Sequence, residues 1–122
     1  MTIETERDYC LSLPLVTEDF PFDDQTLAFR IMDRIFACMD MERPEWVTMK
    51  CNPDRALELR EEYVEIEGAW HWNKKHWSDV FYASIDEETV RLWIRESYQL
   101  MVSKLPKSLR LRYESGTAST AT

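Results

Sequence analysis

The side chains best suited to chemistry lie in one segment, Trp70 to Tyr82, which reads WHWNKKHWSDVFY. It holds three of the five tryptophans, both histidines and the chain's adjacent pair of lysines. Lysines can neutralise phosphates, and exposed indole rings can stack on nucleic-acid bases. Lysines are also common in solvated turns, a histidine can fix a turn by bonding to a backbone carbonyl, and one of the tryptophans can belong to the core. The segment therefore indicates either a contact with a partner or a well-ordered hairpin.

Metal binding is a second chemistry to weigh. His71 and His76 are separated by four residues, and Cys51 could add a third ligand. Zinc sites usually show a second cysteine pair or an HExxH helix, and neither is present. An acidic group near the N-terminus reads as a solvated loop, because carboxylates without fixed geometry are ordinary surface; it comprises Glu18, Asp19, Asp23 and Asp24. We expect no metal and no other cofactor.

Catalytic motifs are missing from the sequence. It contains no GxSxG, P-loop or GxGxxG pattern, and two glycines leave no obvious loop to cradle a phosphate. We therefore expect a binding protein and not an enzyme.

Charge is distributed unevenly along the chain. The net charge is −8; residues 1–24 carry seven acids against one base, whereas residues 101–122 carry four bases against one acid. An acidic protein repels a polyanion at long range, so binding to nucleic acid requires a basic face that is segregated from the acidic one.

Length and composition predict one soluble globular domain. The chain has 122 residues, of which 44% are hydrophobic and 31% charged, enough for a single core. We expect the domain to span residues 1–113 and residues 114–122 to form a flexible tail. No leader-like N-terminus or long apolar run occurs, so we expect a cytoplasmic protein without a membrane segment. Cys10, Cys38 and Cys51 form no CxxC pair and are expected to be buried free thiols.

Hydrophobic periodicity and turn signals predict the secondary structure. Asn52 before Pro53 marks a helix start, and Asp86 caps a helix with a continuous apolar stripe. The expected helices span residues 2–10, 53–63 and 86–105, with a short basic turn at 108–113; the expected strands span residues 27–31, 35–41, 46–51, 65–72 and 77–83. This α-β(3)-α-β(2)-α order is compatible with a two-layer α+β domain in which helices cover one face of an antiparallel sheet. The other face is then the candidate site.

These residues resemble the MmcQ/YjbR family of small bacterial proteins. The resemblance covers about nine tenths of the chain, and its most specific part is Asn73-Lys-Lys-His-Trp77. It also includes Cys10-Leu-Ser-Leu-Pro14, Thr17-Glu-Asp-Phe-Pro-Phe22, Arg43-Pro44, Trp46, Lys50, Pro53, Glu58-Leu-Arg60, Ser97-Tyr98 and Lys104-Leu-Pro106. The chain departs from the family at Leu15 and at Met32-Asp33, where a glycine is usual, and at Ser84-Ile85, which replaces Asp-Gly.

The resemblance implies a CyaY-like or secretion-chaperone-like fold and, by shape, DNA binding through a double wing of hairpins. The DNA-binding residues would be Asn73, Lys74, Lys75 and His76 in one hairpin, with Arg30, Lys50 and Trp72. Lys104, Lys107 and Arg110 are further candidates. The alternative is a protein or peptide interaction module of the secretion-chaperone-like type, in which the uncovered sheet face or an aromatic patch receives a partner segment. A contiguous positive surface would favour DNA, and scattered lysines over an apolar patch would favour a peptide.

Overall fold

The computed structural model describes residues 1–69 and 72–120, with side chains described as far as residue 113. In this part of the chain, six strands form one antiparallel sheet in the order β1-β2-β3-β4-β6-β5. The strands are β1 (Thr17–Asp19), β2 (Thr26–Ile31), β3 (Arg34–Asp40), β4 (Trp46–Lys50), β5 (Ile66–Gly68) and β6 (Trp77–Phe81). The helices are α1 (Ile3–Ser12), α2 (Pro53–Glu62), α3 (Glu87–Ser103) and α4 (Lys107–Thr120). The α+β class with helices on one face of an antiparallel sheet is confirmed.

Local capping explains where the helices begin. The Thr2 side chain accepts a hydrogen bond from the Thr5 amide in a reciprocal capping box, and the Asn52 side chain accepts bonds from the first amides of α2. Asp86 does the same for α3. These side chains satisfy amide groups that have no partner inside the helix, so the predicted starts of α2 and α3 are confirmed.

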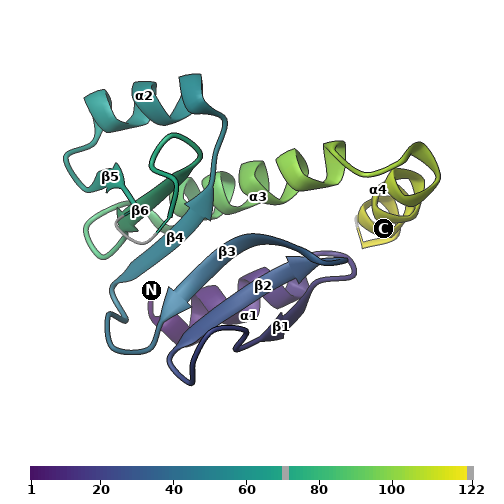
Figure 1. The fold of residues 1–122 in the computed structure, drawn as a ribbon, viewed down its shortest axis with the longest axis horizontal. Helices are drawn as coiled ribbons and strands as arrows, with labels where there is room; N and C mark the ends of the chain where they lie inside the picture. Colours follow the sequence, from purple (N-terminus) through teal and green to yellow (C-terminus); the bar gives the residue numbers. More distant parts are fainter. Residues whose placement is uncertain (70–71, 121–122) are drawn as a thin grey trace.

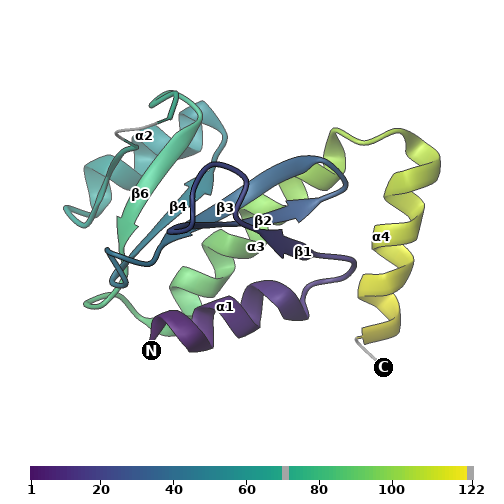
Figure 2. The same ribbon diagram turned by 60° about the horizontal axis from the view of Figure 1, so that its bottom comes forward.

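Helix α3 supplies much of the core. It crosses the sheet and packs against β2, β3 and β4. All eight residues of its predicted stripe are buried, namely Val90, Trp93, Ile94, Ser97, Tyr98, Met101, Val102 and Leu105. Figure 2 shows α1 and α3 on the same side of the sheet, while α4 stands beside the C-terminal end of α3. None of the helices in the described residues has the length and apolar character that crossing a membrane would require.

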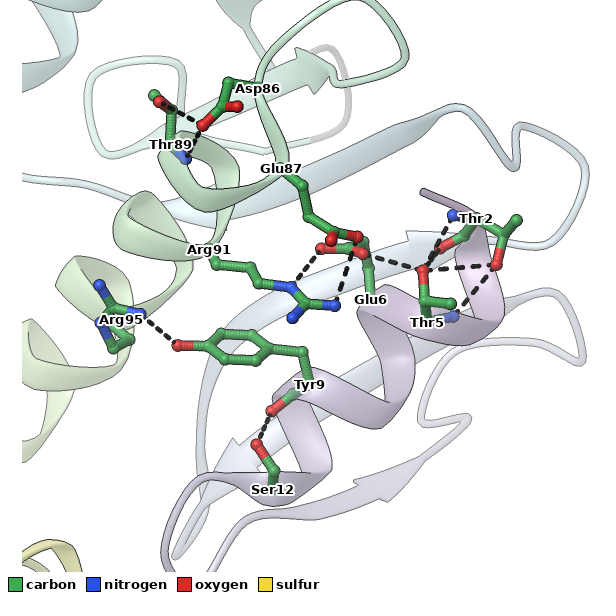
Figure 3. Close-up of polar contacts among 10 residues, drawn as sticks. All are labelled: Thr2, Thr5, Glu6, Tyr9, Ser12, Asp86, Glu87, Thr89, Arg91 and Arg95. Atoms are coloured by element: carbon green, nitrogen blue, oxygen red, sulfur yellow. Dashed lines mark hydrogen bonds and ion pairs between the residues drawn. The ribbon is translucent and has the colours of Figure 1, made fainter. Parts of the chain in front are cut away.

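An ion pair joins α1 to α3 (Figure 3). Glu6 is fully buried, and its carboxylate lies 3.3 Å from Nε of Arg91. The Arg91 guanidinium also lies over the Tyr9 ring at 4.8 Å, and Arg95 donates to the Tyr9 hydroxyl at 2.7 Å. Because a buried carboxylate is costly without a partner, these contacts hold α1 against α3 in one register.

The sequence interpretation missed one strand. Thr17–Asp19 was expected to lie in a loop, but it pairs with Ala28 to Arg30 as the edge strand β1. Three residues are too few to show a period of two, so only the pairing with β2 identifies the strand. The observed order is thus α-β(4)-α-β(2)-α-α.

Two other segments also differ from expectation, one at the C-terminus and one at β5. Residues 108–113, predicted as a short turn, belong to the longer helix α4. Strand β5 ends at Gly68, well before the expected end at Trp72. That the segment from Glu114 is a flexible tail stays a prediction.

In the described part of the chain, two residues other than glycine have the backbone conformation that glycine favours. Leu15 has φ of 61° and Met32 has φ of 55°. These are two of the positions at which the chain departs from the family's glycines. Met32 and Asp33 form a two-residue turn between β2 and β3, a connection that commonly requires a positive φ. The turn is therefore formed with a side chain in a strained position.

Candidate functional site

Both hairpin tips lie at the same end of the sheet (Figure 1). Ile31 pairs with Arg34 beside the β2–β3 turn, and Lys50 pairs with Trp77 beside the turn that precedes β6. In the second half of α3, the Ser97 hydroxyl donates to the Lys50 carbonyl at 2.5 Å. This contact holds α3 against the end of β4, beside the turn of residues 73–76.

Hydrogen bonds fix the shape of that turn. The Asn73 side chain accepts from the Lys75 amide at 3.0 Å, and the Asn73 carbonyl accepts from the amides of His76 and Trp77, each at 3.0 Å. From α2, the guanidinium of Arg60 donates to the carbonyls of Lys74 at 2.6 Å and Trp77 at 3.0 Å. Asn73 thus has a structural role, and Arg60 is a supporting residue that the sequence interpretation did not identify.

Four residues from three elements form a basic cluster: Lys50, Lys75, His76 and Lys104. Partial burial is the first cause that lowers the pKa of His76, followed by repulsion from the three lysines. The pKa of Lys50 is lowered by burial and then by Lys104. These effects place Lys50, Lys75 and Lys104 within electrostatic reach of His76, and Lys104 within reach of Lys50. Among the side chains described, no carboxylate forms an ion pair with the three lysines.

Besides Asn73, three of the predicted residues lie outside this cluster: Arg30, Trp72 and Lys74. The charge of Arg30 is balanced, because its Nε lies 2.9 Å from a carboxylate oxygen of Asp19. Trp72 is half-buried and packs between Phe22, at 5.7 Å between ring centroids, and Trp77, at 4.4 Å. Trp72 therefore lies against Trp77 on the uncovered side of the sheet. Lys74 is exposed at the turn, and its stem packs closely over Gly68.

Trp77 is the core tryptophan of the segment. Only 8% of it is exposed, and Lys50 Nζ lies 5.1 Å from its ring centroid, so its ring has little room for a nucleic-acid base. Trp70 and His71, considered above for base stacking and for zinc, lie outside the described residues. Trp77 confirms the expectation that one of the three tryptophans belongs to the core.

Comparison with known proteins identifies the family. The family model for YjbR matches residues 11–100. This range includes the turn of residues 73–76, most of α3 and every residue of the basic cluster except Lys104. The chain belongs to the YjbR family.

Similar family members cover nearly the same length. The chain is 29% identical to the Escherichia coli K12 protein named "Uncharacterized protein YjbR", over 90% of this chain and 95% of that one. It is 30% identical to "Uncharacterized protein YbdF" of Escherichia coli O157:H7, over 93% and 94% of the two chains. These YjbR-family relatives agree with the resemblance carried by the NKKHW turn.

Solved structures support the same fold. A Deinococcus radiodurans protein with a DUF419 domain superposes with a TM-score of 0.82 at 33% identity, covering 93% of this chain and 88% of its own. A crystal structure from Pseudomonas syringae superposes with a TM-score of 0.70 at 23% identity, covering 82% and 98%. The second comparison concerns the fold alone.

Three carboxylates of the N-terminal acidic group in this YjbR-family chain interact with other groups of the same chain. Glu18 pairs with Arg7, whose hydrogen bond lowers the pKa of that carboxyl, and Asp19 pairs with Arg30. The amides of Gln25 and Thr26 lower the pKa of Asp23. In the described residues, no three histidine, cysteine or acidic side chains gather in a way that could hold one metal ion.

The three thiols do not share one environment. Cys10 and Cys38 are buried free thiols, as expected. Cys51 is only half-buried and lies 3.5 Å from the Ser78 hydroxyl, so the expectation of a buried thiol was wrong there. Cys51 directly follows the last residue of β4, at the end of a central strand of the sheet.

Proposed function

We propose that this YjbR-family protein binds the phosphate backbone of nucleic acid through the basic cluster of Lys50, Lys75, His76 and Lys104. The observation that carries the proposal is the convergence of three lysines around His76, with no paired carboxylate among the described side chains, in a chain whose net charge is −8. Lys75 and Lys104 are exposed and can reach a phosphate. The proposed role is binding, without catalysis.

The position of the cluster supports contact with an extended polyanion. The β2–β3 turn and the turn before β6 lie at corresponding ends of their strands, and Lys104 at the C-terminal end of α3 lies within electrostatic reach of His76. Contacts from lysine to phosphate position a protein on nucleic acid but carry no sequence information, so we expect weak sequence preference. The half-buried Trp72 and the covered Trp77 are poor stacking platforms, which favours backbone contacts over base contacts.

Salt dependence provides the test. Lys75→Ala and Lys104→Ala should each reduce the slope of log K against log salt by about one, and the double variant by about two, on single- and double-stranded DNA alike. Arg43→Ala removes the same charge between β3 and β4, at the opposite end of the sheet, and should leave the slope unchanged.

Two results would contradict the proposal. One is no detectable binding to either DNA at low salt; the other is an equal loss for Arg43→Ala and Lys104→Ala, which would indicate a nonspecific charge effect. In either case a protein or peptide partner on the uncovered sheet face becomes the leading hypothesis.

A further inference from the structure

The uncovered face of the sheet contains a pocket of about 510 Å³. Its floor is formed by Cys38, Thr48 and Asp79 on the neighbouring strands β3, β4 and β6, and Phe22 and Trp72 line it from two loops. This volume is within the range of small-molecule sites. The pocket shares no residue with the basic cluster, and its lining carries more acidic than basic side chains.

A buried carboxylate lies on the pocket floor. Asp79 is only 4% exposed, and the Thr48 hydroxyl donates to one of its oxygens at 2.5 Å. Among the described side chains, no cation forms an ion pair with Asp79, and its cross-strand neighbour on β5 is another acid, Glu67. A buried carboxylate is costly without compensation, and the donor that the described side chains supply to Asp79 is the neutral Thr48 hydroxyl. A cation in the pocket would add a charged partner on this floor.

The remaining lining suits an organic cation. Asp23 and Asp40 add two further carboxylates, whereas Arg43 is the one cation among the described lining residues and lies over the Trp46 ring at 4.5 Å. Phe22 is 62% exposed although it is a large aromatic side chain, and its ring meets that of Trp72 edge to face. Aromatic faces and carboxylates together recognise ammonium and guanidinium groups.

A metal ion fits this lining less well. The acidic side chains in the described residues do not gather three at a time around one point. They are distributed over a pocket that is large enough for several heavy atoms, with apolar walls that a bare ion would not use. A molecule with a cationic head and a short apolar stem can contact both kinds of surface.

We propose that this pocket binds a small organic cation that carries an ammonium or guanidinium group on a short apolar chain. The cationic head donates to Asp79, and the stem packs between Phe22 and Trp72. The proposal is independent of the nucleic-acid proposal, because the two sites share no residue.

To test the proposal, agmatine and putrescine are titrated into the intact protein, and binding is measured by calorimetry and tryptophan fluorescence. 1,4-Butanediol and succinate serve as neutral and anionic comparison compounds. We expect at least one of the two amines to bind with a Kd below about 1 mM and the comparison compounds not to bind. Asp79→Asn keeps an oxygen that can accept from Thr48 and should weaken amine binding about tenfold or more. Asp33→Asn removes the same charge from the exposed β2–β3 turn and should change binding less than about twofold.

A second pair of variants does not depend on a buried position. Phe22→Ala should weaken amine binding about fivefold without affecting folding, since Phe22 is mostly exposed. Leu57→Ala, at a similarly exposed apolar residue on α2, should have no effect. Thermal melts of all four variants identify any that fail to fold. If Asp79→Asn is among them, the comparison of Phe22→Ala with Leu57→Ala tests the proposal.

Several outcomes would overturn the proposal. These are no binding of either amine, equal weakening by Asp79→Asn and Asp33→Asn, or unchanged binding in Phe22→Ala. A capped arginine-containing pentapeptide that binds more than about tenfold tighter than agmatine would assign the pocket to a protein segment and contradict a free small molecule as the ligand.

Discussion

Arg60 on α2 donates a hydrogen bond of 2.6 Å to the backbone carbonyl of Lys74, so a helix supports the turn that presents the lysines. The same guanidinium nitrogen donates to the carbonyl of Trp77 and to the Ser78 hydroxyl, each at 3.0 Å. One side chain thus holds the start of β6 and the turn before it. The shape of the basic cluster depends on α2, although α2 contributes no residue to it.

Arg60→Met should loosen this turn. The substitution leaves two carbonyls without their charged donor, and hydrogen bonds to charged groups contribute about 1.5–3 kcal/mol. We expect amide hydrogen exchange at His76 and Trp77 to accelerate at least about tenfold. Arg55→Met removes the same charge from α2, where Arg55 pairs with Glu96, and should leave these two amides unchanged. Equal exchange in both variants would show that the turn does not need Arg60.

His76 should titrate below an ordinary histidine, whose pKa is 6.5. Burial and the three lysines disfavour its charged form, so the unfolded chain binds more protons than the folded chain just below pH 6.5. The destabilisation is absent above that pH and grows as the pH falls through the ordinary histidine pKa. His76→Gln should reduce this loss of stability, as measured in denaturant melts between pH 5 and about 7.5.

Proton NMR measures the His76 pKa directly, with the His76→Gln variant assigning its signal. Addition of DNA should raise that pKa, because phosphates offset the repulsion from the lysines. A pKa at or above 6.5 in the free protein would contradict the arrangement of the basic cluster.

The cysteines should react in a defined order. Burial raises the pKa of Cys10 strongly and that of Cys38 to about 12, and it also raises the pKa of the half-buried Cys51. Because the thiolate is the reactive form and needs access, Cys51 should be alkylated first, and Cys10 and Cys38 only after unfolding. Mass spectrometry of peptides after timed labelling distinguishes the three. Faster labelling of Cys10 than of Cys51 would be inconsistent with the packing of α1.

Met32→Gly should stabilise the protein by about 0.5–1 kcal/mol. The positive φ of Met32 costs a residue with a side chain about 1–2 kcal/mol, and part of the gain is offset because glycine has more freedom in the unfolded chain. Met41→Gly, at an exposed methionine without a positive φ, should not stabilise. Denaturant melts compare the two variants, and a loss of stability in Met32→Gly would show that the methionine side chain makes compensating contacts.

Local features of the sequence determined helices α2 and α3 and the family. Asn52 with Pro53, and Asp86 before the stripe of α3, satisfy helix amides through neighbours only a few residues away, so their effect is visible without a structure. The stripe itself follows from the helical period, which places residues three and four apart on one face. The Asn73 to Trp77 turn likewise identified the YjbR family from adjacent residues.

Tertiary structure alone decided the rest. Thr17–Asp19 became a strand because β2 offered it an edge, and Lys50, Lys75 and Lys104 became neighbours because α3 packs against the end of β4. Asp79 became the floor of a pocket through the register of β6 beside β4, which places it opposite Thr48. Contacts between residues far apart in the chain depend on packing and strand register, and neither is encoded in a local period. The sequence therefore showed which groups could act, and the fold determined which of them lie together.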